Sequence, residues 1–225
     1  VVAATFVALG MWQLDRLQER RGMNRMAAER LAMEPVPFDQ IENEDPESIE
    51  FRPVTVEGRP LAGDEVLIRS QVYLGIAGYH LIVPVSYRGG TAVLVNRGWV
   101  PLGTEVGSFD HGVDDNMNIT IQGWISPTQE RPPLGPTDPE SGDLTIMNRV
   151  DIDRIRAQLT SGSDLADVYI VETGEQGSGP PFPIGAPDVD DEGPHLGYAV
   201  QWFGFTAVLV IGYVFLARRR LRYSA

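Results

Sequence analysis

The chain has 225 residues, 18 arginines, 31 acidic residues, no lysine and no cysteine, which gives a net charge of −13. Without cysteine it cannot form disulfides, thiolate nucleophiles, zinc–thiolate sites or iron–sulfur sites. All the acidic residues but only fourteen of the arginines lie between Asp15 and Glu192, so this middle part carries −17. Such an acidic region argues against nucleic-acid binding, which needs a basic face.

The amino end is apolar over residues 1–14, and the residues that follow have the pattern of a helix continuing into water. No small-residue cleavage site follows the apolar run, so we predict an uncleaved first transmembrane helix with an outward extension, residues 1–32, rather than a signal peptide. The sequence starts at Val1 rather than at methionine, and we expect further residues upstream.

The middle of the chain is predicted to be a β-rich domain. Residues 33–50 are expected to form an irregular acidic linker. The RGG at residues 88–90 predicts a hairpin, and an apolar stripe at residues 151–159 predicts one short helix. We predict an antiparallel sandwich or small barrel over residues 51–176. Its expected strands are residues 51–60, 65–73, 79–87, 91–100, 118–125, 144–150 and 167–175.

The carboxyl end is predicted to be a membrane anchor. A proline- and glycine-rich tether, residues 177–194, leads to a second transmembrane helix, residues 195–217, which is long enough to cross a bilayer. The arginines of the tail, residues 218–225, place this end in the cytoplasm. The predicted fold class is therefore an α+β membrane protein, in which two transmembrane helices flank an extracytoplasmic domain.

Four arginines conflict with this orientation, because they follow the first helix on its outer side, where the positive-inside rule disfavours positive charge. Glu19 offsets them only in part. They are Arg16, Arg20, Arg21 and Arg25.

The polar residues contain no pattern typical of an enzyme. His80, His111 and His195 are far apart in sequence, and no pair has metal-ligand spacing. We expect His80 to be a packed or surface strand residue and His111 to lie in a solvated turn. The run DVDDEG at residues 188–193 resembles the start of a calcium loop, but Ala199 occupies the position of its last ligand.

The stretch VLVNRGWVP, residues 93–101, is an unusual strand. A glycine within a strand marks a bulge or a close approach of backbone. We interpret the stretch as a local fold device, in which Asn96 satisfies backbone groups and Trp99 covers the sheet. The alternative is a partner-binding site.

The second predicted span has two distinct faces. The first face would form an aromatic belt at the membrane interface, with His195 as a helix-start residue, or would hold a haem with His195 as axial ligand. The second face is narrow, and we expect it to pack against the first span. The first face holds His195, Tyr198, Trp202, Phe205 and Leu209, and the second holds Gly197, Gln201, Gly204, Val208 and Ile211.

Four motifs in this order resemble the Surfeit-locus family of cytochrome c oxidase assembly factors. LGMWQLDRLQER is similar to the first-span signature Gly-x-Trp-Gln-x-x-Arg of that family, and FRPVTVEGRP to its first strand. VLVNRGWVP resembles its central hallmark. HLGYAVQWFGF resembles the His-Leu-x-Tyr-Ala-x-Gln-Trp-Phe core of its second span.

The resemblance implies a two-span protein of the bacterial inner membrane, with a β-rich domain outside and the carboxyl end in the cytoplasm. It implies a chaperone rather than an enzyme. The chaperone would assist haem a insertion into an aa3-type oxidase, or stabilise subunit I during maturation. The implied cofactor is transiently bound haem a, with His195 on the iron and Tyr198 and Trp202 beside the macrocycle.

The expected partners are oxidase subunits, especially subunit I, and membrane lipid. Alternatively, the chain is a permanent accessory subunit of the oxidase or of a respiratory supercomplex, without a haem of its own. A third alternative is a ligand-binding domain that uses the interior of the β-structure. The motif residues expected to shape the fold or a partner surface are Trp12, Gln13, Arg16, Asn96, Arg97, Gly98, Trp99, Gly197, Gln201 and Gly204.

Overall fold

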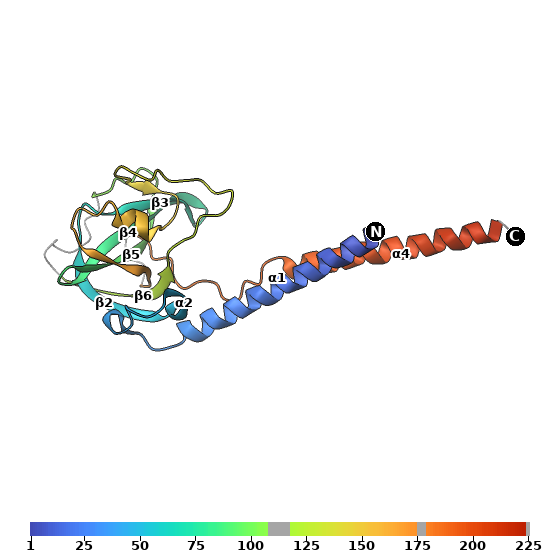
Figure 1. Ribbon diagram of the computed structural model, residues 1–225, viewed down its shortest axis with the longest axis horizontal. Helices are drawn as coiled ribbons and strands as arrows, with labels where there is room; N and C mark the ends of the chain where they lie inside the picture. The colour runs from blue at the N-terminus through green and yellow to red at the C-terminus, as the bar shows by residue number, and fades with distance from the viewer. Residues whose placement is uncertain (108–117, 175–178, 224–225) are drawn as a thin grey trace. The chain divides into compact units, whose positions relative to one another are not determined.

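The computed structural model describes residues 1–107, 118–174 and 179–223. They form two compact units (Figure 1): a β-rich domain of residues 30–187, and a helical unit that combines residues 1–29 with residues 188–225. His111 lies outside the described residues.

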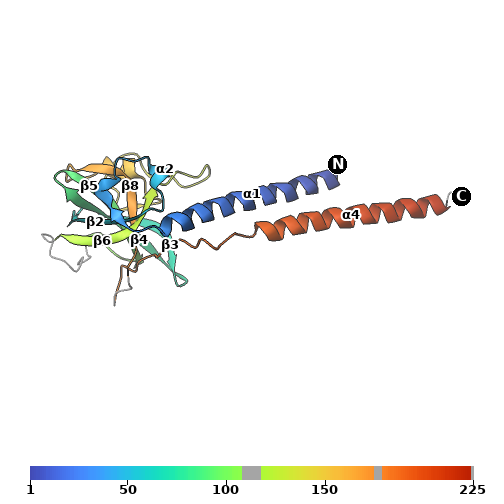
Figure 2. The ribbon, with the colours of Figure 1, turned by 90° about the horizontal axis from the view of Figure 1, so that it is seen from below.

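The strands of the domain close into a small barrel. In the described part of the chain, β2, β6, β8, β5 and β4 pair in that order, and a further pairing of β2 with β4 closes the ring (Figure 2). β3 and β7 extend the sheet beyond β4, and β1 pairs with β2. The strands are β1 Val36–Pro37, β2 Pro53–Pro60, β3 Val66–Tyr73, β4 Ile76–Arg88, β5 Thr91–Pro101, β6 Ile119–Pro127, β7 Ile146–Met147 and β8 Asp164–Glu172.

The small barrel and the hairpin at residues 88–90 are confirmed, but the antiparallel prediction is only partly right. β4 and β5 pair antiparallel, whereas β8 runs parallel to β5, β1 to β2 and β7 to β3. Parallel neighbours need a crossover connection. Between the parallel neighbours β5 and β8, the chain passes through β6, β7 and the short helix α3, Ile152–Arg156.

The barrel interior is filled by apolar side chains from all five ring strands and from the segment that precedes β2. A second apolar core lies on the opposite faces of β5 and β8, under β3, β7 and α3. Val93 and Val95 of β5 belong to the first core, and Ala92 and Leu94 to the second. The filled interior contradicts the ligand-binding alternative. It also explains why β5 is apolar at consecutive positions, since both its faces are buried.

Residues 33–50 are not an irregular linker. They include β1, the short 3-10 helix η1 Phe38–Gln40 and the helical turn α2 Pro46–Ile49. Phe38 and Ile49 are buried in the barrel core. Asp45 caps α2 by accepting a hydrogen bond from the N–H of Glu47. The acidic composition concealed these two apolar anchors.

The helical unit contains α1, Val2–Leu31, up to Glu29, together with α4, His195–Tyr223. The two helices lie side by side in both ribbon views (Figures 1 and 2) and run antiparallel, since Phe6 contacts Phe205 while Gln13 contacts His195. Among the helices of the described residues, only α4 is long and apolar enough to cross a membrane. α1 continues as one helix through its charged part, as its sequence predicts.

Candidate functional site

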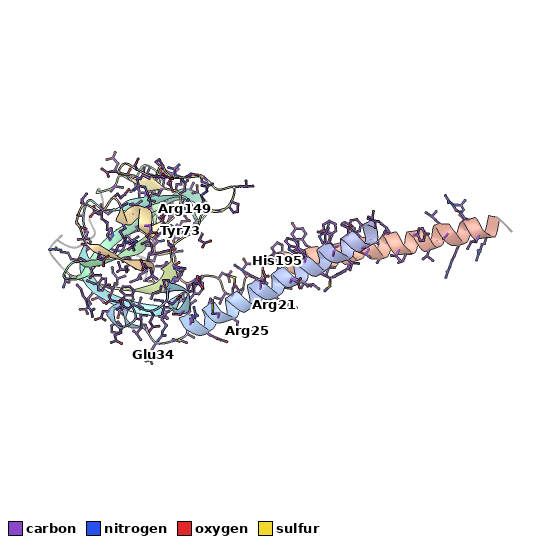
Figure 3. All side chains as sticks on the ribbon, viewed as in Figure 1. Arg21, Arg25, Glu34, Tyr73, Arg149 and His195 are labelled. Atoms are coloured by element: carbon purple, nitrogen blue, oxygen red, sulfur yellow. The ribbon has the colours of Figure 1, made fainter. Side chains whose placement is uncertain are left out.

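His195 is the first residue of α4, and it contacts α1 (Figure 3). Its Nδ1 lies 2.9 Å from Oε1 of Gln13. An amide oxygen only accepts, so Nδ1 carries the proton and donates it to this bond. In the neutral ring the lone pair then lies on Nε2, the form in which histidine binds a metal.

Aromatic contacts continue along the same side of α4. The ring of Phe6 lies 5.4 Å from that of Trp202 and 6.0 Å from that of Phe205, measured between centroids. Trp202 therefore takes part in the contact between the helices. Tyr198 is 49% exposed and its ring remains accessible beside His195.

The small-residue face of α4 does not pack against α1, contrary to the prediction. A Cβ atom built on Gly197 or Gly204 would meet nothing within 4 Å, and Gln201 is exposed. The close approach comes from α1, where a Cβ on Gly10 would lie 2.7 Å from the ring of Phe203. The small residue at the contact therefore comes from α1 and the large one from α4, whereas the prediction placed the small residues on α4.

Three of the four arginines that conflict with the positive-inside rule have local partners. Arg21 forms two hydrogen bonds with Glu192, of 2.7 and 2.8 Å, and Arg20 donates to the carbonyl oxygen of Asp191 at 3.1 Å. The carboxylate of Glu192 raises the pKa of Arg21, and the arginine lowers the pKa of Glu192. The acidic run before α4 thus neutralises part of the basic run after the first apolar segment. Arg16 pairs with Glu19 and lies over the ring of Trp12.

Gly98 shows why the central hallmark contains a glycine. Its φ of +115° lies in the left-handed region, and the register of β4 and β5 shifts at this point. A Cβ here would lie 2.1 Å from the carbonyl oxygen of Phe182. The expected bulge and close backbone approach are both present, and the approaching segment is part of the predicted tether.

Trp99 holds this segment on the domain. Its backbone N–H donates to the carbonyl oxygen of Phe182 at 2.7 Å, and the N–H of Phe182 donates back at 2.8 Å. The rings of Trp99, Phe182 and Tyr73 form one stacked cluster, with Phe182 5.2 Å from Tyr73. Trp124 also binds the segment, through a 3.3 Å bond from Nε1 to the carbonyl oxygen of Gly185.

Asn96 makes the expected backbone contact, since its Oδ1 accepts a 3.1 Å bond from the N–H of Gly98. Its amide group also lies 3.4 Å from Nδ1 of His80. Burial lowers the pKa of His80 to about 4. Arg97 forms an ion pair with Glu172 of β8. These residues therefore stabilise the strand and the segment docked on it.

Sequence reasoning did not identify Phe182 and Tyr73 as parts of this cluster. Phe182 stands in a proline-rich stretch, and Tyr73 near a hairpin turn, so neither position has a periodic pattern that signals a contact. The sequence signal for this contact was Gly98, because a glycine within a strand indicates that another stretch of backbone lies close to it. Among the described residues, no group of three or more histidines and carboxylates could hold a metal ion.

The motif that contains Gln13 and the motif that begins at His195 thus meet in the helical unit. The motif VLVNRGWVP holds the proline-rich segment on the barrel through Trp99. These features agree with the comparisons with known proteins. The sequence profile of the SURF1 family matches residues 1–207. The chain belongs to the SURF1 family, whose members are known in general as assembly factors of cytochrome c oxidase.

Related proteins cover nearly the whole chain. An uncharacterised SURF1-like protein of Mycobacterium tuberculosis (strain ATCC 25618 / H37Rv) is 28% identical over 99% of this chain and 83% of its own length. A SURF1-like protein of Rickettsia felis is 24% identical over 97% of this chain and 96% of its own length. One of Caenorhabditis elegans is 23% identical over 92% of this chain and 67% of its own.

Proposed function

We propose that this protein is a membrane-anchored, non-enzymatic assembly factor of an aa3-type cytochrome c oxidase. It assists haem a insertion into subunit I or stabilises that subunit while its metal centre forms. In this proposal α1 and α4 both cross the bacterial inner membrane, the barrel lies outside, and the arginines after Leu216 remain in the cytoplasm.

The observation that carries the proposal is the hydrogen bond between Gln13 and His195. It joins the signature of the first helix to the opening of the last one, although 182 residues separate the two positions. A glutamine that only packed in a helix pair would not need to orient an imidazole ring. A glutamine that accepts from Nδ1 leaves Nε2 free to bind a metal, as carbonyl partners of metal-binding histidines do.

The residues present fit a haem with one histidine ligand. His195 would hold the haem iron through Nε2, and the haem would supply the iron porphyrin that the oxidase subunit receives. Gln13 sets the ring orientation, and the exposed ring of Tyr198 is available to cover the macrocycle. Trp202 packs against Phe6 of α1, and in this proposal it lies beside the macrocycle at the contact between the two helices.

The experiment is purification of the tagged protein in mild detergent, followed by a haem spectrum and a subunit count. We expect an a-type haem signal without stoichiometric oxidase subunits. His195→Ala should abolish the signal, and Gln13→Leu should weaken it because the ring is no longer oriented. His80→Asn is the matched control, since it removes a histidine from the barrel, outside the proposed site.

Two results would contradict the haem role. The first is an a-type signal that persists in His195→Ala. The second is a signal that appears only in proportion to co-purified oxidase subunits at equal stoichiometry, which would support the alternative of a permanent accessory subunit of the oxidase or of a supercomplex. The exposed face of Gly197, Gln201 and Gly204 would then be available for packing against a partner helix.

A further inference from the structure

The hairpin of β3 and β4 extends beyond the rest of the sheet. β5 pairs with β4 as far as Gly78, and β7 pairs with β3 only at Leu67 and Ile68. Residues 71–77 are therefore a two-stranded projection (Figure 2), and two strands alone are marginally stable in water. Its support within the domain is Tyr73, which stacks on Trp99 and Phe182.

The tip of this projection exposes large apolar side chains. Val72 is 67% exposed, Leu74 84% and Ile76 61%. The pairing of Gly78 with Pro101 brings the next residue, Leu102, to the same end of the sheet, where it is 60% exposed. Single exposed apolar residues are normal, whereas four of them at one end of a sheet are a candidate interaction site. We call these four residues the hairpin tip.

Leu74 has an unfavourable backbone conformation as well as an exposed side chain. Its φ is +49° and that of the following Gly75 is +81°. A two-residue turn of this kind favours asparagine or glycine at both positions. Leucine in the left-handed region costs about 1 kcal/mol, and its exposed side chain recovers none of this cost by burial. Folding of the domain therefore does not explain a leucine here, whereas contact with an apolar surface does.

The charge of the tip also differs from that of the chain. No acidic residue occurs from Val66 to Thr104, although the whole chain has 31 of them and a net charge of −13. Arg69, at the base of the projection, is exposed. This stretch is thus the part of the domain that an anionic lipid surface would repel least.

The chain itself connects the hairpin to the proposed membrane anchor. Phe182 stacks on Tyr73 of the hairpin, and α4 begins at His195, thirteen residues later. An extended chain of that length spans at most about 45 Å. A membrane that contains α4 is therefore within reach of the cluster that supports the hairpin, without any other partner being needed.

We propose that the hairpin tip inserts into the lipid–water interface of the membrane that anchors α4. A projecting turn with aliphatic side chains suits the boundary between headgroups and acyl chains, which interfacial segments enter by about 5–10 Å. A protein partner is a poorer match, because stable interfaces bury about 800 Å² on each side, more than a single turn offers. The proposal rests on the membrane anchoring in the proposed function, but not on haem.

The 225-residue chain contains no cysteine, so a single introduced cysteine allows a direct test. Leu74→Cys is labelled with an environment-sensitive fluorophore and reconstituted into vesicles of phosphatidylethanolamine and phosphatidylglycerol that contain a spin-labelled lipid with a shallow quencher. We expect the fluorescence to fall by about half or more, because a label inserted at the lipid–water interface lies at the same depth as the shallow quencher. Leu134→Cys is the matched control, since it is a fully exposed leucine in another loop, and it should not be quenched.

A third label, Val208→Cys near the middle of the proposed span of α4, is read in vesicles whose lipid carries the spin label deep in the acyl chain, and it separates the two proposals. If position 208 is quenched by lipid and position 74 behaves like position 134, the hairpin proposal is wrong and the membrane anchor is retained. If position 208 is not quenched, the anchor itself fails. If position 74 is shielded only after oxidase-containing membranes are fused in, the tip binds protein, and the lipid proposal is overturned.

A second variant tests the chemistry of the tip. With the label at Ile76→Cys, Leu74→Asp should abolish quenching, because a carboxylate is poorly accommodated at an anionic interface. Leu74→Met keeps an apolar side chain and should retain it. Since Leu74 is exposed, neither change removes a buried contact. Equal quenching in both variants would contradict the proposal.

Discussion

The barrel and the helix pair are held together in different ways. In the barrel, Val93, Val95 and Ile170 are fully buried among side chains from every ring strand. In the helix pair almost every apolar side chain of α4 is exposed, and Ala199 is the buried residue of that helix within the described part. The helix α4 contacts α1 through a few aromatic rings and through polar groups near the start of α4.

The buried apolar core suits the barrel to water, and the exposed apolar length of α4 is compatible with the membrane anchoring proposed above. Burial of apolar surface from water stabilises the barrel. Between two helices in lipid this driving force is absent, since acyl chains are as apolar as leucine, and packing and hydrogen bonds determine the association. Changes in the barrel should therefore alter the free energy of unfolding, whereas changes in the helix pair should alter helix proximity and leave the barrel folded.

The largest effect is expected from a cavity in the barrel core. Ile170→Ala removes a fully buried side chain and should reduce the free energy of unfolding by about 4 kcal/mol. Urea unfolding of the detergent-solubilised protein, followed by tryptophan fluorescence, measures it. Leu134→Ala, at a fully exposed leucine, is the control and should have almost no effect. Equal losses would mean that the barrel interior is not a packed core.

The next largest effect is expected in the pH dependence of the free energy of unfolding of the barrel. The pKa of His80 is about 4 in the folded state because of burial, against about 6.5 when unfolded. Between these values the unfolded chain binds a proton that the folded chain does not. Stability should thus fall as the pH drops from 6.5 to 4, by at most about 3 kcal/mol.

His80→Asn should remove this part of the pH dependence. The difference between wild type and variant is the informative quantity, because carboxylates titrate in both proteins. Parallel pH profiles for the two proteins over this range would show that His80 is not buried in its neutral form.

Docking of the segment around Phe182 should make a smaller contribution to the free energy of unfolding. Comparing alanine substitutions at two glycines separates this contribution from the cost of the backbone conformation. Gly90 and Gly98 both have positive φ, but a Cβ on Gly90 meets nothing within 4 Å. Gly90→Ala should cost about 1 kcal/mol of unfolding free energy for its backbone conformation alone. Gly98→Ala should cost about 2 kcal/mol more, because the methyl group displaces the carbonyl of Phe182. Equal costs would show that the approach of Phe182 contributes nothing.

The smallest effect on stability is expected in the helix pair. Gly10→Leu places a side chain where the ring of Phe203 lies, and overpacking of this kind costs about 1–3 kcal/mol of association. Cysteines at positions 13 and 195, joined by a short bismaleimide, measure helix proximity, and their cross-linking yield should fall several-fold. Gly204→Leu is the matched control and should keep the yield, since its surroundings are open. The urea unfolding curve of the barrel should not change in either variant.

Much of the barrel could be predicted because its strands have local signals. Alternation and β-branched residues located β2 to β6, and the RGG located one turn. The parallel pairing of β5 with β8 was not predictable, because it depends on the path of the chain through the crossover rather than on either strand. Phe38 and Ile49 were missed because the acidic residues around them suggested a solvated linker.

At the candidate site, the sequence correctly predicted that His195 begins the last helix and that Gly98 meets another backbone. It did not indicate which face of α4 meets α1. The small-residue stripe was the natural choice, yet Gly10 provides the close approach from the other helix. Such an exchange between small and large residues is a property of the pair, which no single helix pattern contains.

The sequence by itself determined the family, the run of strands, the apolar length of the last helix and the positions that need glycine. These depend on local propensity, on length and on motifs that can be read within a few residues. Only the tertiary structure decided that Gln13 orients His195, that Phe182 docks on Trp99 and that the barrel closes between β2 and β4. Each of these joins residues far apart in the chain, where pairing depends on packing in space rather than on neighbouring residues.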